Sequence, residues 1–142
     1  SRGLGDVYKR QTQDLPRFAS LYQVPLTVNP HFPINTLNLM RGAVATLDQD
    51  YFDNYVVAVY DAIWVRGDNM GNLDVVANVL TGAGLNAKKI IAATQDPDIK
   101  AALISNTEAA VARGCFGAPT MFIGTDMFFG QDRMQFIEMA LK

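Results

Sequence analysis

The sequence has few of the residues on which many kinds of site depend. It contains one cysteine and one histidine among 142 residues. One cysteine excludes an intrachain disulfide framework, a CxxC redox pair and a cysteine-rich zinc site within these residues. One histidine excludes HExxH-type metal chemistry and leaves His31 as the sole candidate for a Ser-His-Asp triad.

The sequence also lacks a large excess of positive or negative charge, and it lacks long apolar runs. The formal net charge at pH 7 is −2, which gives no electrostatic footprint for nucleic acid or an anionic membrane. No apolar run approaches the roughly 18 residues that cross a bilayer, and no signal-peptide pattern opens the chain. Hydrophobic residues make up 49% and charged residues 18%, as in an ordinary globular domain. We therefore expect a cytoplasmic protein without nucleic-acid or membrane partners.

Residues 1–11 (SRGLGDVYKRQ) differ in character from the rest of the chain. They have neither helical nor strand periodicity and precede the first amphipathic run abruptly. They resemble translated adaptor sequence, so we expect a non-native segment; a natural disordered terminus is the alternative. If the segment is foreign, residues 12–142 are the C-terminal part of a longer native protein.

The pattern from residue 13 to residue 113 is mainly helical. Apolar side chains recur at three- and four-residue steps, separated by proline, glycine and capping residues. The expected helices cover residues 13–22, 36 to about 44, 50–67, 73–80, 85–94 and 97–113, with Asn35 or Thr36 as the cap of the second. Residues 25–33 hold three prolines and cannot form a regular helix. Their spacing in the helices predicts these inward-facing residues: Tyr55, Tyr60, Trp64, Ile99, Leu103, Ala110 and Val111.

The sequence after residue 114 changes to β-forming residues. Residues 119–124 (PTMFIG) and 127–129 flank Thr125-Asp126, which predicts a tight hairpin with its turn there. A last helix is expected from Gly130 and Gln131, with one apolar face made of Met134, Ile137, Ala140 and Leu141. Two short strands are not stable alone, so helices cover the sheet or further strands are missing.

Residues 113–138 (RGCFGAPTMFIGTDMFFGQDRMQFIE) resemble the C-terminal signature of the 2-hydroxychromene-2-carboxylate isomerases. These proteins belong to the kappa-class glutathione transferase and DsbA-like branch of the thioredoxin superfamily. The resemblance runs from about residue 14 to residue 142, and the FGAPTMF and FFGQDR blocks are its specific part. It implies an α/β, thioredoxin-like fold with a helical insertion, predominantly helical here. Residues 12–113 would be mostly that insertion and residues 114–142 the β-β-α half, with the first β-α-β unit truncated.

The resemblance also implies glutathione as the cofactor and places its binding side at Ala118, Pro119, Phe129, Gly130, Gln131 and Asp132. A cis Ala118-Pro119 bond would turn the Ala118 backbone to the surface, where a peptide-like ligand can pair with it. A trans bond at the start of an edge strand is the alternative. The start of the last helix favours a carboxylate, and Asp132 can hold an ammonium group. Ordinary capping by Asp132 is the alternative.

Other residues carry weaker expectations. The resemblance places the proline-rich loop, and Phe32 in particular, at a pocket for a small aromatic substrate; a loop residue that merely packs is the alternative. Cys115 is interpreted as a small buried thiol, because no second cysteine or basic cluster activates it. The serine that would stabilise the glutathione thiolate belongs to the segment expected to be missing. We therefore assign no catalytic residue and expect this chain alone to be inactive and poorly soluble.

Three functions stay open on the sequence. The first is a glutathione-dependent isomerase of aromatic catabolism, and the second is a DsbA-like thiol-disulfide oxidoreductase whose CxxC would lie in the missing segment. The third is a non-catalytic helical interaction module. The FGQDR block favours the first, because disulfide exchange requires no γ-glutamyl site. The relatives also imply a homodimer, although no residue of this sequence argues for one.

Overall fold

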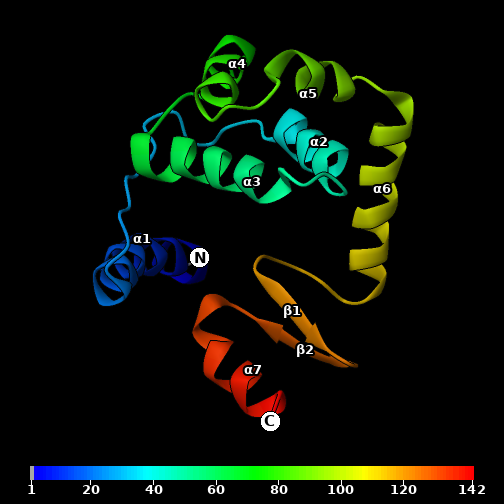
Figure 1. Cartoon of the computed structure of the whole chain (residues 1–142). Coiled ribbons are helices and arrows are strands. Elements are labelled where there is room, and N and C mark those ends of the chain that lie inside the picture. Colours follow the sequence, from blue (N-terminus) through cyan, green and yellow to red (C-terminus); the bar gives the residue numbers. More distant parts are fainter. Residues whose placement is uncertain (1) are drawn as a thin grey trace. The chain divides into compact units, whose positions relative to one another are not determined.

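The structure is a computed structural model that describes residues 2–142, with side chains from residue 12 onward (Figure 1). The chain divides into two compact units, Ser1–Lys100 and Ala101–Lys142. None of the described helices is both long enough and apolar enough to span a membrane.

The first unit opens with helix α1 (Arg2–Tyr22). The helix ends before Val24-Pro25 as predicted, and Gln23 follows it with φ of 54°. The helix begins earlier than the predicted residue 13, because residues 2–11 are also helical although their sequence shows no periodicity. Once the amphipathic turns form, each further helical residue adds one backbone hydrogen bond without a new nucleation cost. The foreign origin of residues 1–11 and the assignment of residues 12–113 and 114–142 to two halves stay predictions.

Four helices form the core of the first unit (Figure 1): α2 (Leu37–Thr46), α3 (Phe52–Asp61), α4 (Leu73–Gly82) and α5 (Ala87–Ala93). α2 packs on α3 and α5, and α4 packs on α3 and α5. Asn72 and Asn86 cap α4 and α5 by accepting hydrogen bonds from the backbone N–H groups of Asp74 and Lys89. The main buried apolar side chains are Leu39, Tyr55, Ile63, Met70, Val76, Leu80, Leu85 and Ile90.

The expected core positions on α3 are only partly confirmed. Tyr55 is 2% exposed, but Tyr60 is 64% exposed. The buried stripe of this helix follows Tyr55, Val59 and Ile63 at four-residue steps, and Tyr60 is one residue, or about 100°, away from it. After Asp61 the helix widens into a π-helical turn, Ala62–Arg66, in which Trp64 is partly buried. The turn ends at Gly67, whose φ is 73°.

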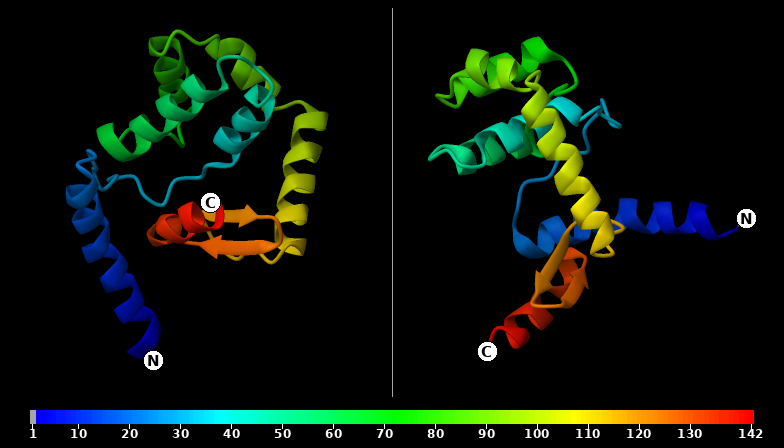
Figure 2. Two further views of the ribbon diagram at one scale, coloured as in Figure 1. Left: turned by 60° about the horizontal axis from the view of Figure 1, so that its bottom comes forward. Right: turned by 90° about the vertical axis from the view of Figure 1, so that its right-hand side faces the viewer.

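The second unit contains the predicted hairpin (Figure 2). Helix α6 (Pro97–Ala112), which begins in the first unit, precedes it. Strands β1 (Thr120–Ile123) and β2 (Asp126–Phe129) are antiparallel, with Thr120 opposite Phe129. The two-residue turn is Gly124-Thr125, one residue earlier than expected, because Gly124 adopts the positive φ (60°) that the tight turn requires. A 3-10 turn, Gln131–Arg133, then leads into α7 (Met134–Ala140).

The expected inward faces of α6 and α7 are wrong as core assignments. On α6, Val111 is 64% exposed, while Ile99, Leu103 and Ala110 are half-buried. On α7, Met134 is 57% exposed. Leu141, the residue after the end of this helix, is 71% exposed. Periodicity identifies an apolar face but not a partner for it, and the sheet among the described residues has two strands. The predominance of helix agrees with expectation, whereas these two faces are at most half-buried.

Candidate functional site

The start of the hairpin has the backbone path that the sequence led us to expect. The Ala118-Pro119 peptide bond is cis. The carbonyl oxygen of Pro119 accepts a hydrogen bond from the N–H of Gly130 at 3.0 Å, so the ladder continues one residue beyond each strand. Within residues 2–142 no hydrogen bond involves the Ala118 N–H or carbonyl. These two groups can pair with an extended ligand.

Phe116 and Gly117, which precede Ala118 and were not singled out from the sequence, both contact the ring of Phe129. The ring of Phe116 lies 4.6 Å from the ring of Phe129, centroid to centroid. A Cβ built on Gly117 would lie 2.7 Å from Cε2 of Phe129. The Phe129 ring therefore lies directly on the backbone at Gly117. A glycine two residues before the proline was the only signal in the sequence for this close approach.

Gly130 and Asp132 lie close together at the other end of the candidate site. Gly130 has φ of 101°, and a Cβ there would lie 2.6 Å from Oδ1 of Asp132. The other oxygen of that carboxylate, Oδ2, accepts a hydrogen bond from Arg133 at 2.8 Å, in a pair that is about half exposed. Among the described residues, no side chain caps the turn that starts after Gly130. The Asp132 carboxylate is therefore accessible to a ligand cation.

Arg113 and Cys115, which lie close to these residues in the sequence, are not placed among the proposed ligand-binding groups. The guanidinium carbon of Arg113 lies 3.6 Å from the ring centroid of Phe122, a cation–π contact. Cys115 is a free, half-buried thiol. The described residues hold no cluster of metal-binding side chains.

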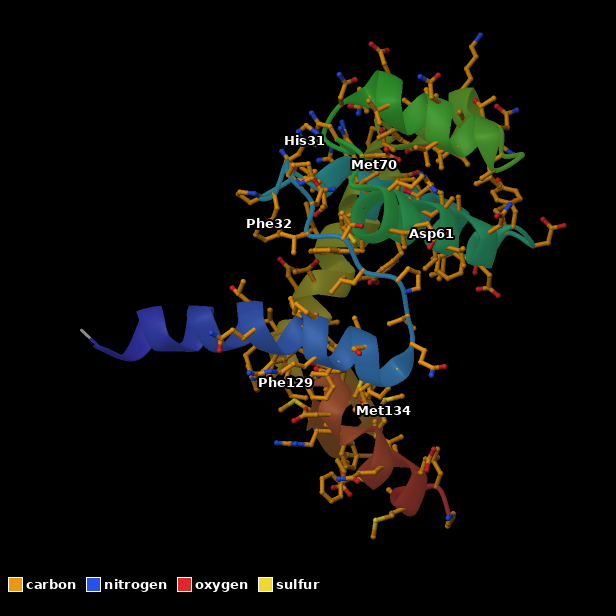
Figure 3. The ribbon with its side chains drawn as sticks, turned by 90° about the vertical axis from the view of Figure 1, so that its left-hand side faces the viewer. His31, Phe32, Asp61, Met70, Phe129 and Met134 are labelled. Atoms are coloured by element: carbon orange, nitrogen blue, oxygen red, sulfur yellow. The ribbon has the colours of Figure 1, made fainter. Side chains whose placement is uncertain are left out.

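Phe32 lies in the loop between α1 and α2, next to His31 (Figure 3). Its side chain is 59% exposed, and its ring lies 6.1 Å from the Trp64 ring, tilted by 44°. The two rings border a cavity of about 200 Å³. The other residues that line the cavity are the apolar Leu15, Leu26 and Val28 and the polar Thr12, Thr27 and Asn29. The expectation of an aromatic pocket at Phe32 thus has a matching hollow in the first unit.

Three consecutive carbonyls of the π-helical turn hold this loop in place. The Asn29 side-chain amide donates to the carbonyl of Ile63 at 2.9 Å. The N–H of Thr27 donates to the Trp64 carbonyl at 2.6 Å, and the Thr27 hydroxyl donates to the Val65 carbonyl at 2.7 Å. These roles of Thr27 and Asn29 were not predicted from the sequence. A single asparagine in a proline-rich loop was their only sequence signal, and a π turn has no periodicity of its own.

A larger hollow of about 570 Å³ lies between α3 and α4. Its lining includes Asp61, Arg66 and Asp68, and the last two pair with each other at 3.0 Å. No aromatic side chain of the described residues lines it. It therefore suits a flat aromatic ligand less well than the cavity at Phe32.

Comparisons with known proteins agree with this architecture. The pattern of the DSBA-like thioredoxin domain matches residues 6–142. The chain is 31% identical over 128 residues to a 2-hydroxychromene-2-carboxylate isomerase of Sphingobium xenophagum, covering 90% of this chain and 65% of that protein. It is also 31% identical over 137 residues to an isomerase of the same name from Pseudomonas sp. (strain C18), covering 90% of this chain and 59% of the relative.

A solved structure of a 2-hydroxychromene-2-carboxylate isomerase superposes with a TM-score of 0.85 at 27% identity, over 99% of this chain and 68% of the other. This chain spans 59–65% of the length of the curated relatives that it matches. The family resemblance predicted from the FGAPTMF and FFGQDR blocks is confirmed. The chain belongs to the DSBA-like thioredoxin domain family and is similar, along nearly all its length, to 2-hydroxychromene-2-carboxylate isomerases.

Proposed function

We propose that the protein is a glutathione-dependent isomerase of the 2-hydroxychromene-2-carboxylate type, acting on a small aromatic compound. The observation that carries this proposal is the 31% identity, over 90% of the chain, to relatives that bear this isomerase's name. In the proposal, the second unit of this chain supplies the glutathione-binding side, and the first unit supplies the pocket at Phe32.

The glutathione side of the proposal assigns a task to each group. The Ala118 N–H and carbonyl pair with the cysteinyl part of the tripeptide, as with an added strand. The Asp132 carboxylate holds the γ-glutamyl ammonium. Arg133, which pairs with Asp132, binds the carboxylate of the γ-glutamyl group. Gly130 lets the backbone approach the ligand without a Cβ. Supporting this assignment are the unpaired Ala118 backbone and the half-exposed Asp132.

Glutathione, when bound, would supply a thiolate that adds reversibly to a conjugated substrate, so that a double bond becomes single and can rotate. The residues of this chain would hold the tripeptide and orient the aromatic ring. None of them is assigned to stabilise the thiolate, and we propose that the 142-residue chain binds without turnover. The protein is proposed to act in the cytoplasm.

The test combines melting with an isomerase assay on the 142-residue chain. We expect reduced glutathione to raise the melting temperature with the concentration dependence of a native-state ligand, and Asp132→Asn to weaken that rise. We expect no isomerisation of 2-hydroxychromene-2-carboxylate. An unchanged melting temperature at all concentrations would contradict the glutathione site. Isomerisation would contradict the absence of a catalytic group here.

A further inference from the structure

We propose that Trp64 is a substrate-contacting residue: its indole ring packs on a flat two-ring aromatic ligand and its Nε1–H donates a hydrogen bond to a ligand oxygen. The choice of substrate class rests on the proposed function. The role of Trp64 does not come from the resemblance, which assigned only Phe32 to the substrate. It comes from the cavity, the hydrogen bonds and the π-helical turn of the first unit.

The size and lining of the cavity fit an aromatic ring system. Its volume is about 200 Å³, and an apolar protein cavity of about 150 Å³ is enough to take up benzene. Leu15, Leu26 and Val28 contribute apolar walls. Phe32 and Trp64 lie 6.1 Å apart, within the 4.5–7 Å or so at which aromatic rings attract each other. Because both rings also line the cavity, a flat ring that enters it would contact two aromatic side chains.

Most polar groups that line the cavity already have partners. The Thr27 hydroxyl donates to Val65, and the Asn29 amide donates to the carbonyls of Ile63 and Asp68 at 2.9 and 3.0 Å. The Asn29 side-chain oxygen accepts from the N–H of His31. The Trp64 indole N–H, in contrast, has no acceptor among the described residues. The indole nitrogen is accessible to solvent, so a ligand oxygen can take the place of water as its acceptor.

The π-helical turn fixes the position of the indole. Turns of this kind are rare and occur frequently at functional sites. The carbonyls of Ile63, Trp64 and Val65 all accept hydrogen bonds from Thr27 or Asn29. The loop that carries Phe32 and the turn that carries Trp64 are thus joined into one element. Thr27 and Asn29 are positioning residues for the two rings.

The chain's single tryptophan makes the test direct. A ¹⁵N-labelled sample gives one indole N–H signal in an NMR spectrum, because the sequence holds one tryptophan. The 142-residue chain, fused to a tryptophan-free solubility partner, is titrated with chromone-2-carboxylate in the absence of glutathione. The saturated analogue decahydronaphthalene-2-carboxylate is the ligand control. We expect a saturable shift of the indole signal with the aromatic ligand and little shift with the saturated one.

Matched variants test the pocket itself. Phe32→Leu should weaken binding about three- to tenfold, through the loss of one aromatic contact. Tyr60→Leu should leave the affinity unchanged, because this similarly exposed ring of the first unit (64%, against 59% for Phe32) does not line the cavity. Thr27→Val should weaken binding with little loss of fold, because it removes one bond to the turn.

An indole signal that stays in place up to millimolar ligand would overturn the proposal, as would equal affinities for the aromatic and saturated ligands. Equal effects of Phe32→Leu and Tyr60→Leu would also overturn it. Because glutathione is absent from the titration, failure of the glutathione site would not change these results. The two proposals can therefore fail separately.

Discussion

Gly42 on α2 lies directly against the phenol ring of Tyr55 on α3. A Cβ built at residue 42 would overlap the Tyr55 hydroxyl oxygen and lie 2.8 Å from Cζ. That hydroxyl donates a hydrogen bond of 2.7 Å to the carbonyl of Leu39 on α2. The close approach of the two helices therefore depends on the missing side chain at residue 42.

Gly42→Ala should destabilise the first unit by about 1–3 kcal/mol, because the methyl group displaces the buried phenol and its hydrogen bond. Chemical denaturation followed by circular dichroism measures the change. Gly82→Ala on α4 is the matched control, since a Cβ there meets nothing within 4 Å. It should be neutral or stabilising by up to about 1 kcal/mol. Equal effects of the two substitutions would contradict this packing.

The same phenol predicts a loss of stability at high pH. Burial raises the pKa of Tyr55 from 10.0 to about 12. The folded state then holds the proton more tightly than the unfolded chain, so the stabilisation is complete below pH 10 and is lost as the pH rises through 12. The free energy involved is about 3 kcal/mol at most. Denaturation of the wild type and Tyr55→Phe at pH 9 to 12 measures it.

In that comparison the wild type should be the more stable protein at pH 9, by roughly 1 kcal/mol for the hydroxyl's hydrogen bond to Leu39. Its advantage should shrink above pH 10 and reverse by about pH 12, because the loss of about 2 kcal/mol or more on ionisation exceeds it and the phenylalanine cannot ionise. A constant difference across this range would show that Tyr55 does not titrate as a buried phenol.

Gly130→Ala should reduce glutathione affinity by about tenfold or more, because an alanine at φ of 101° is strained and its Cβ would lie 2.6 Å from Oδ1 of Asp132. Calorimetric titration with reduced glutathione measures the affinity. Gly124→Asn is the control, since a Cβ in the hairpin turn meets nothing within 4 Å and asparagine tolerates positive φ. Unaltered affinity in Gly130→Ala would place the ligand elsewhere.

Protection from hydrogen exchange should differ between the two units. Among residues 12–142, every buried side chain lies between Asn29 and Thr94. Amides of α3 and α4 should therefore exchange slowly, and those of β1, β2 and α7 within seconds to minutes, because few buried apolar contacts oppose their opening. Mass spectrometry of exchanged peptides measures this. Equal protection of both units would contradict the exposure of α7.

The proline after α1 predicted the end of that helix, because its effect acts within a few residues. The asparagine caps of α4 and α5 and the glycine in the hairpin turn are equally local signals, but they were not assigned from the sequence. The cis Ala118-Pro119 bond followed from the resemblance rather than from local preference. Trp64 was predicted to face inward and is partly buried against the core. Its place at the Phe32 cavity could not be predicted, because it depends on a π turn whose carbonyls bond to residues more than 30 positions away. The predicted burial of the apolar faces of α6 and α7 was wrong, because an amphipathic pattern identifies an apolar face but not the element that would cover it.

The most direct measurement for the proposed isomerase is a titration of the ¹⁵N-labelled 142-residue chain with reduced glutathione, followed through the backbone amides. The account predicts saturable shifts that are largest at Ala118, Gln131 and Asp132 and are greatly reduced in Asp132→Asn. Amides that stay in place at these three residues, or shifts confined to the first unit, would contradict the glutathione site.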